Sequence, residues 1–186
     1  MGHHTFDASR ADKLEDAARR YRFLSAEELL GALALDPTDA VVDLGSGTGF
    51  YTDDVAPHAG QVYAVDVQEA MHDYYRQKGV PDKVELVTGG VDDLPFETGS
   101  LDAAFATMTY HEFASAAALA EVARVLDDAA TLVVADWAAS GSGDVGPPVA
   151  ERYTADDAAD ALRDSGFDVE TRAVRPETFV VVATPG

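Results

Sequence analysis

Short apolar runs alternate along the chain with amphipathic segments at helical spacing. Each apolar run is flanked by glycine, proline, aspartate or serine, which is typical of strands that end in turns. The predicted strands span residues 40–44, 61–65, 84–87, 101–106, 130–135, 167–174 and 178–184. The predicted helices span residues 6–24, 25–35, 51–56, 68–78, 114–126 and 154–162. The pattern therefore indicates an α/β protein.

The order of these elements also predicts how the strands pair. Strands that alternate with helices form βαβ units, whose right-handed crossovers give a parallel sheet covered by helices on both faces. The last two predicted strands are joined only by a short turn at Arg175 and Pro176, so they must pair antiparallel. We expect a doubly wound, mostly parallel sheet that ends in one antiparallel hairpin.

Composition narrows the class of protein. A chain of 186 residues is large enough for one domain with a sizeable core. Its 34 acidic and 13 basic residues give a net charge of −21, which disfavours nucleic acid or anionic membranes as partners. The sequence has no apolar run long enough to span a bilayer, no charged-then-apolar leader and no cysteine, so disulfides and thiolate metal sites are excluded. These features together predict a cytoplasmic protein.

The residues 41–51, VVDLGSGTGFY, carry the strongest functional signal. A buried strand runs into a turn in which Gly45, Gly47 and Gly49 leave the backbone without side-chain bulk. Backbone N–H groups of such a turn, and of the helix that follows, can face a ligand at the carboxyl end of the strand. The alternative is a glycine-rich turn that binds nothing.

Three further segments converge on the same edge of such a sheet. Asp66 ends the second strand, where its carboxylate can accept hydrogen bonds from two ribose hydroxyls. The loop 90–96 follows the third strand, and the segment 107–111 follows the fourth. In an open α/β sheet these loops line one crevice where the strand order reverses.

Asp43 precedes the first glycine by two residues, and it distinguishes this turn from a dinucleotide fingerprint. A carboxylate that points into the turn suits an ammonium or sulfonium ligand and would repel pyrophosphate. The spacing also differs, because Phe50 stands where G-x-G-x-x-G requires its third glycine. A nicotinamide enzyme is therefore disfavoured.

From about Leu30 to the C-terminus, the chain resembles class I S-adenosylmethionine-dependent methyltransferases of the small-molecule type. The resemblance lies in VVDLGSGTGFY, VYAVDVQEAM, GGVDDLPFETGSLDAAFA and LAEVARVLDDAATLVVADW. It implies a Rossmann-like sheet of seven strands with the last strand antiparallel, and S-adenosylmethionine as cofactor. It also divides the single domain into a helical lid segment at residues 1–36 and a cofactor-binding core at residues 37–186.

The resemblance also implies roles for individual residues. Asp66 would bind the ribose hydroxyls, Val91 and Asp92 the adenine, and the main chain at Thr107 or Met108 the methionine ammonium. The remaining expected cofactor contacts are Asp43, Gly45, Ser46, Gly47, Gly49 and Val67. Two departures stand out. Gly90 occupies a position where many relatives carry an acid, so the adenine would rely on Asp92 or Asp93, or on the main chain alone, and residues 127–130 replace a Pro-Gly-Gly turn.

His111 is the candidate catalytic residue. It lies in the predicted loop that faces the methyl group, where it could act as a general base; alternatively it only shapes the pocket. The acceptor pocket is expected to include Tyr21, Tyr110 and Trp137. The histidines of the sequence are too scattered to predict a metal site.

We expect an enzyme that transfers a methyl group to a small-molecule acceptor. The alternative is a regulatory or partner subunit of the same fold that binds S-adenosylmethionine without catalysis. Since the chain leaves no room for a separate substrate domain, either the acceptor is small or a second copy in a homodimer completes the pocket.

The acidic excess generates a first prediction. An acidic chain can be disordered, but 47% hydrophobic residues and clear strand patterns favour a folded, halophilic surface whose self-repulsion is screened by salt. We expect partial unfolding in dilute buffer and a higher melting temperature in molar KCl. Circular dichroism measures both, and identical spectra and melting temperatures in the two solutions would contradict a halophilic surface.

Overall fold

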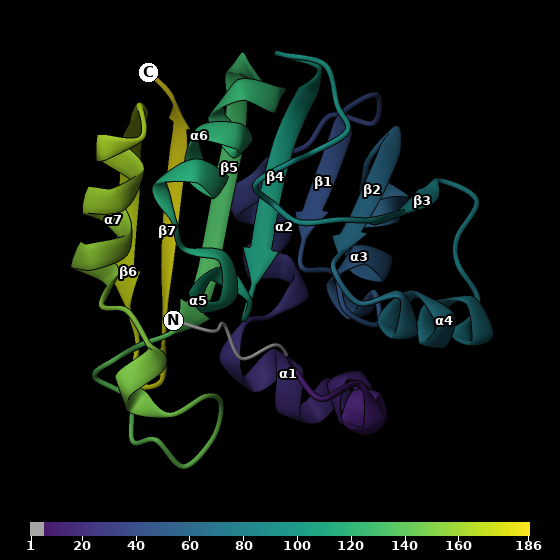
Figure 1. Cartoon of the computed structure of the whole chain (residues 1–186), viewed down its shortest axis with the longest axis horizontal. Helices are drawn as coiled ribbons and strands as arrows, with labels where there is room; N and C mark the ends of the chain where they lie inside the picture. Colours follow the sequence, from purple (N-terminus) through teal and green to yellow (C-terminus); the bar gives the residue numbers. More distant parts are fainter. Residues whose placement is uncertain (1–5) are drawn as a thin grey trace.

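The computed structural model describes residues 6–186, and its centre is one seven-stranded sheet of order β3-β2-β1-β4-β5-β7-β6 (Figure 1). The strands are β1 (Ala40–Leu44), β2 (Gln61–Asp66), β3 (Val84–Thr88), β4 (Leu101–Thr107), β5 (Leu126–Trp137), β6 (Phe167–Val174) and β7 (Thr178–Pro185). Strands β3, β2, β1, β4 and β5 are parallel, and β7 pairs antiparallel with both β5 and β6. The predicted Rossmann-like fold with its antiparallel last strand is confirmed.

The helices cover both faces of this sheet (Figure 1). They are η1 (Ala8–Glu15), α1 (Ala17–Phe23), α2 (Ala26–Leu33), α3 (Phe50–Val55), η2 (Ala56–His58), α4 (Glu69–Lys78), α5 (Tyr110–Phe113), α6 (Ala116–Val125), η3 (Val149–Glu151) and α7 (Ala155–Asp164). Side-chain caps fix several starts: Ser25 accepts from the backbone N–H of Glu28, and Thr154 forms a capping box with Asp157.

The predicted helix 6–24 is two helices in the structure. Asp16 lies between η1 and α1 with extended backbone angles, and its carboxylate accepts a hydrogen bond from the N–H of Arg19. An aspartate that caps a new helix cannot continue the previous one. The break turns the N-terminal segment across the carboxyl edge of the sheet.

Two other elements differ from the prediction. Strand β5 already begins at Leu126, so residues 127–130 are part of the strand, and a register shift between Leu101 and Ala103 in β4 accommodates them. The predicted loop 107–111 contains the start of α5, whose short helix begins at Tyr110. That helix decides which way the side chains after β4 point.

The central strands of the sheet contribute to two hydrophobic layers, one on each face. In β1, Val42 and Leu44 belong to the layer under α6 and α7, whereas Val41 belongs to the layer under α2. Successive side chains of a strand point to opposite faces, and both faces of a parallel sheet are buried. The second layer includes Leu29 and Leu33, so the N-terminal helices are anchored to the core.

No helix within residues 6–186 is long and apolar enough to cross a membrane. His3 and His4, two of the five histidines, lie outside the described residues, as does the start of the predicted lid segment 1–36.

Candidate functional site

A cavity of about 720 Å³ lies at the carboxyl edge of the parallel strands. The ends of β1, β2 and β4 point to this edge, beside α1 and α5 (Figure 1). Its walls come from the loops after these strands, from the segment 89–92 after β3 and from the N-terminal helices. The sheet geometry thus brings together the four segments that the sequence predicted to meet.

The glycine turn after β1 is built on the neighbouring strand. The N–H groups of Gly45 and Ser46 both donate to the carbonyl of Val65, and the N–H of Gly47 donates to Asp66 Oδ2 at 2.8 Å. The three glycines have φ values of 78°, 55° and 78°, in the left-handed region that other residues rarely adopt. Gly45, Ser46 and Gly47 line the cavity.

Gly49 has a structural role that differs from the expected one. It is not among the residues that line the cavity. A Cβ at this position would overlap the ring of Tyr75, which packs against the turn from α4. The missing side chain at Gly49 therefore makes room for the protein's own core.

Asp66 lies where the sequence placed it, at the end of β2 and on the cavity wall. Its Oδ1 accepts from the N–H of Gln68 and its Oδ2 from the N–H of Gly47, both at 2.8 Å. These bonds hold the carboxylate still and leave lone pairs on both oxygens for a ligand. Val67, next in the chain, is exposed and also lines the cavity.

Asp43 corrects one expectation. It is 1% exposed and lies behind the glycine turn, and it is not among the residues that line the cavity. Its Oδ2 accepts a hydrogen bond from Thr52 Oγ1 at 2.6 Å, while its Oδ1 has no partner among residues 6–186. Burial raises the pKa of Asp43 to about 7, although the bond from Thr52 opposes the shift. Asp43 supports the turn from below because α3 places Thr52 over it.

The loop after β3 explains the glycine at position 90. Gly89, Gly90, Val91 and Asp92 all line the cavity. A Cβ on Gly90 would lie 2.5 Å from Asp92 Oδ1, so the Asp92 carboxylate fills the space that a side chain at position 90 would need. Thr107, at the end of β4, is buried and also lines the cavity.

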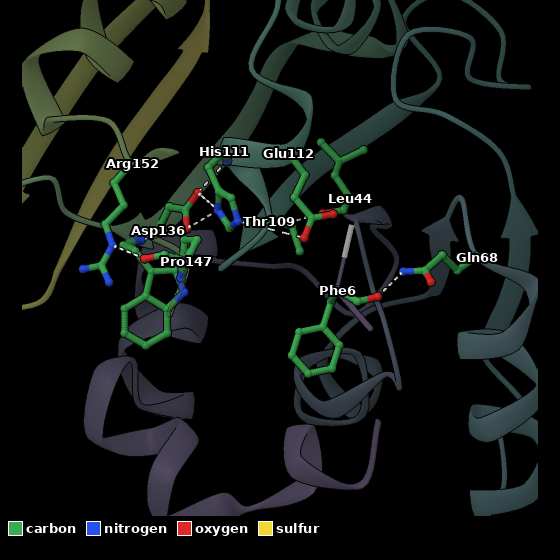
Figure 2. A network of polar contacts seen from close by, with 10 residues as sticks. Phe6, Leu44, Gln68, Thr109, His111, Glu112, Asp136, Pro147 and Arg152 are labelled. Atoms are coloured by element: carbon green, nitrogen blue, oxygen red, sulfur yellow. Dashed lines mark hydrogen bonds and ion pairs between the residues drawn. The ribbon is translucent and has the colours of Figure 1, made fainter. Parts of the chain in front are cut away.

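His111 forms a pair with Asp136, a residue that the sequence analysis missed (Figure 2). His111 Nδ1 lies 2.9 Å from Asp136 Oδ2, and the same carboxylate accepts from the backbone N–H of His111 at 2.7 Å. Asp136 is 1% exposed and ends β5 beside β4, which follows the strand-end rule that identified Asp66. A carboxylate at Nδ1 keeps a proton there and leaves Nε2 as the acceptor nitrogen.

The protonation of this pair follows from its surroundings. Burial alone would lower the pKa of His111, but the hydrogen bond and charge of Asp136 outweigh it and raise that pKa. Glu112 lines the cavity beside His111, with Oε1 3.9 Å from Nε2. Burial raises the pKa of Glu112 to about 7, with His111 opposing the shift. Asp136 therefore favours the protonated form of the His111 imidazole.

Two of the three expected acceptor-pocket residues lie elsewhere. Tyr110 is buried in the core and packs against Phe113 and Tyr153, because α5 turns its side chain inward. Tyr21 is on the surface, where its hydroxyl donates to Asp54. Trp137 and Met108 do line the cavity. The sequence analysis missed other lining side chains, among them Phe6, Arg20, Phe23, Phe50 and Phe113.

Residues 42–134 match the family described as "Methyltransferase domain". The chain belongs to this family. The match begins in β1 and ends in β5, so it includes the glycine turn, Asp66 and His111. The methyltransferase domain also resembles a solved SAM-dependent methyltransferase from Aquifex aeolicus, with 30% identity, a TM-score of 0.88, and coverage of 98% of this chain and 100% of that one.

Two curated relatives are similar over part of their length. A demethylmenaquinone methyltransferase of Mycolicibacterium gilvum is 30% identical over 72% of this chain and 62% of its own. A biotin biosynthesis bifunctional protein of Cellvibrio japonicus is 35% identical over 54% of this chain and 21% of its own. The chain thus covers less than two thirds of the length of either relative.

Within residues 6–186, no group of three or more histidine, aspartate and glutamate side chains is arranged to hold a metal ion.

The His111–Asp136 pair generates a second prediction. In an NMR titration we expect the His111 ring to titrate above the ordinary value of about 6.5, and the buried His72 ring below it. Asp136→Asn removes the negative charge beside the His111 ring, so the pKa of His111 should fall while that of His72 stays unchanged. A pKa of His111 that does not respond to Asp136→Asn would show that the pair is not coupled in solution.

Proposed function

We propose that this methyltransferase domain binds S-adenosylmethionine and transfers its methyl group to a small-molecule acceptor. The observation that carries the proposal is the Asp66 carboxylate, fixed beside the glycine turn at the wall of a cavity. The buried hydroxyl of Ser46, which lines the same cavity and has no hydrogen-bond partner among residues 6–186, is a second group suited to a polar ligand.

The residues present fit this cofactor. Asp66 would bind the two ribose hydroxyls, and the loop Val91–Asp92 the adenine; all three residues line the cavity. The bare backbone of Gly45 and Gly47, with Ser46 between them, would bind the methionine part. When bound, S-adenosylmethionine supplies a methyl group on a positively charged sulfur, which is already a strong electrophile.

The chain's own contribution to the reaction is to orient the acceptor, exclude water and remove a proton. During transfer to an acceptor oxygen, His111 Nε2 would take the proton of the acceptor hydroxyl. Asp136 stabilises the imidazolium that results. Such proton removal contributes typically about 10²–10⁴-fold to a rate.

The wall of the cavity beyond His111 is apolar and suits the body of a small acceptor. It includes Phe23 and Trp137, whose ring centroids are 4.8 Å apart, and Pro147. Arg152 holds this wall, because its Nε donates to the carbonyl of Pro147 at 2.9 Å and its guanidinium lies over Trp137 (Figure 2). The relatives named for menaquinone and biotin biosynthesis also support an organic small molecule as acceptor.

The alternative is a domain that binds the cofactor without catalysis. The buried His111–Asp136 pair favours the enzyme, because a cofactor pocket has no need for a desolvated, charged pair on its acceptor side. Binding of S-adenosylhomocysteine without turnover across a panel of acceptors would favour the alternative.

Cofactor binding is tested by calorimetric titration with S-adenosylhomocysteine. We expect the wild type to bind it, and Asp66→Ala to weaken binding by about 1–3 kcal/mol through lost charge-assisted hydrogen bonds. Asp82→Ala is the matched control, because it removes the same charge from an exposed residue that does not line the cavity. Equal affinities of wild type and Asp66→Ala would remove Asp66 from the cofactor site.

The role of His111 is tested by its effect on the rate. His111→Gln should leave the affinity for S-adenosylhomocysteine nearly unchanged and lower kcat by about 10²-fold or more for a hydroxyl acceptor. Because the base must be neutral and its pKa is raised, the wild-type rate should fall as the pH falls through that pKa. A His111→Gln enzyme with wild-type kcat would assign His111 to the pocket wall alone.

A further inference from the structure

Glu112 is an acidic group on the acceptor side of the cavity, and the proposed reaction does not use it. Helix α5 carries it directly after His111, and its side chain is 21% exposed and lines the cavity. Its Oε1 lies 3.9 Å from His111 Nε2, and Figure 2 shows the carboxyl group turned toward the imidazole ring. This distance is too long for a hydrogen bond, so each of the two atoms can bind a partner of its own.

The protein itself supplies only part of what this carboxyl group needs. In the described part of the chain, residues 6–186, no lysine or arginine lies within ion-pair distance of Glu112. Burial raises the pKa of Glu112 to about 7, and the charge of His111 and a hydrogen bond from the backbone of Phe6 only partly oppose the shift. The bond from Phe6 leaves lone pairs on the carboxylate for further donors. A ligand that displaces water from the cavity therefore has to supply a donor, because a desolvated carboxyl group without partners is costly.

The charges around His111 decide which kind of donor fits. Asp136 lies 2.9 Å from Nδ1 of the ring, Glu112 lies beside Nε2, and Glu151 of η3 lines the same cavity. Burial lowers the pKa of His111, but the negative charges of all three acids act to raise it. A carboxylate or phosphate on the ligand would be repelled by the same charges, whereas a hydroxyl or an amine can donate to them. The donor that Glu112 needs is therefore a hydroxyl or an amine.

We infer that Glu112 binds a second donor of the acceptor, a hydroxyl or an amine on the carbon next to the one that bears the methylated hydroxyl. The inference rests on the proposed function, in which His111 meets the methylated hydroxyl. Because Nε2 and Oε1 are only 3.9 Å apart, the two donors have to be close neighbours in the acceptor. The aromatic wall of Phe23 and Trp137 suits a ring as their carrier. The acceptor is therefore a catechol or a 2-aminophenol.

The experiment measures how four small phenols bind to the protein saturated with S-adenosylhomocysteine. Catechol and 2-aminophenol carry the second donor, phenol lacks the group altogether, and 2-methoxyphenol keeps an oxygen that cannot donate. In NMR titrations we expect the wild type to bind catechol or 2-aminophenol about tenfold more tightly than phenol and 2-methoxyphenol, because the extra hydrogen bond goes to a charged group. The tighter of the two identifies the donor as a hydroxyl or as an amine.

Glu112→Leu removes the acceptor oxygens and should abolish this preference, whereas Glu112→Gln, whose amide oxygen still accepts, should keep part of it. Glu97→Leu is the matched control, since it makes the same change at an exposed residue that does not line the cavity, and it should keep the full preference. Circular dichroism and binding of S-adenosylhomocysteine show that each variant is folded. If Glu112→Leu is unfolded, a reduced preference in folded Glu112→Gln carries the same test.

Three outcomes overturn the inference. The wild-type complex binds the four phenols equally or binds none of them, or every folded Glu112 variant keeps the full preference, or Glu112→Leu weakens phenol as much as catechol and 2-aminophenol. The last result would assign Glu112 to the packing of the pocket wall. If the wild type does not bind S-adenosylhomocysteine, the proposed function itself fails, and this result is distinct from a failure of Glu112 alone.

Discussion

The site depends on hydrogen bonds between the end of β2 and the turn after β1. The carbonyl of Val65 accepts from two successive N–H groups of that turn, and the carboxylate of Asp66 accepts from a third, at Gly47. Because parallel strands end at the same edge, the end of one strand can hold the turn of its neighbour in a left-handed conformation. The same carboxylate lines the cavity, so the group that shapes the turn is also the group that we propose for binding the ligand.

Much of this arrangement could be predicted from the sequence, since the alternation of apolar and amphipathic segments fixes the strands and the strands fix the edge. Asp66 was found because an acid at the end of a buried strand has few structural reasons to be there. Asp136 ends β5 in the same way and could have been found by the same rule.

Side-chain directions could not be predicted, because they depend on elements that the pattern does not show. Asp43 was expected to face the ligand, but Thr52 of α3 binds it from behind the turn. Tyr110 was expected in the pocket, but the short helix α5 directs it into the core. Arg20 gave no sequence signal beyond a basic cluster near a helix end. Its position on the cavity wall depends on the end of the first helix at Asp16, which the sequence pattern does not show.

The basic residues are few, and several bind backbone carbonyls instead of surface acids. Arg124 donates to the carbonyls of Leu94 and Phe96, and Arg152 donates to the carbonyl of Pro147. Arg124 also pairs with Glu121. The loop after β3, which lines the cavity at residues 89–92, and the loop at Pro147 are both held by an arginine in this way.

Asp136 links the chemistry of the site to the shape of its acceptor side. Its carboxylate accepts from His111, and also from the backbone N–H of Trp137 at 2.7 Å. His111 and the aromatic wall are therefore positioned by one buried carboxylate, so the sheet sets the distance between them. Under the proposed function, an acceptor would present its hydroxyl to His111 while its ring or chain lies against Trp137, and this geometry would select among small molecules.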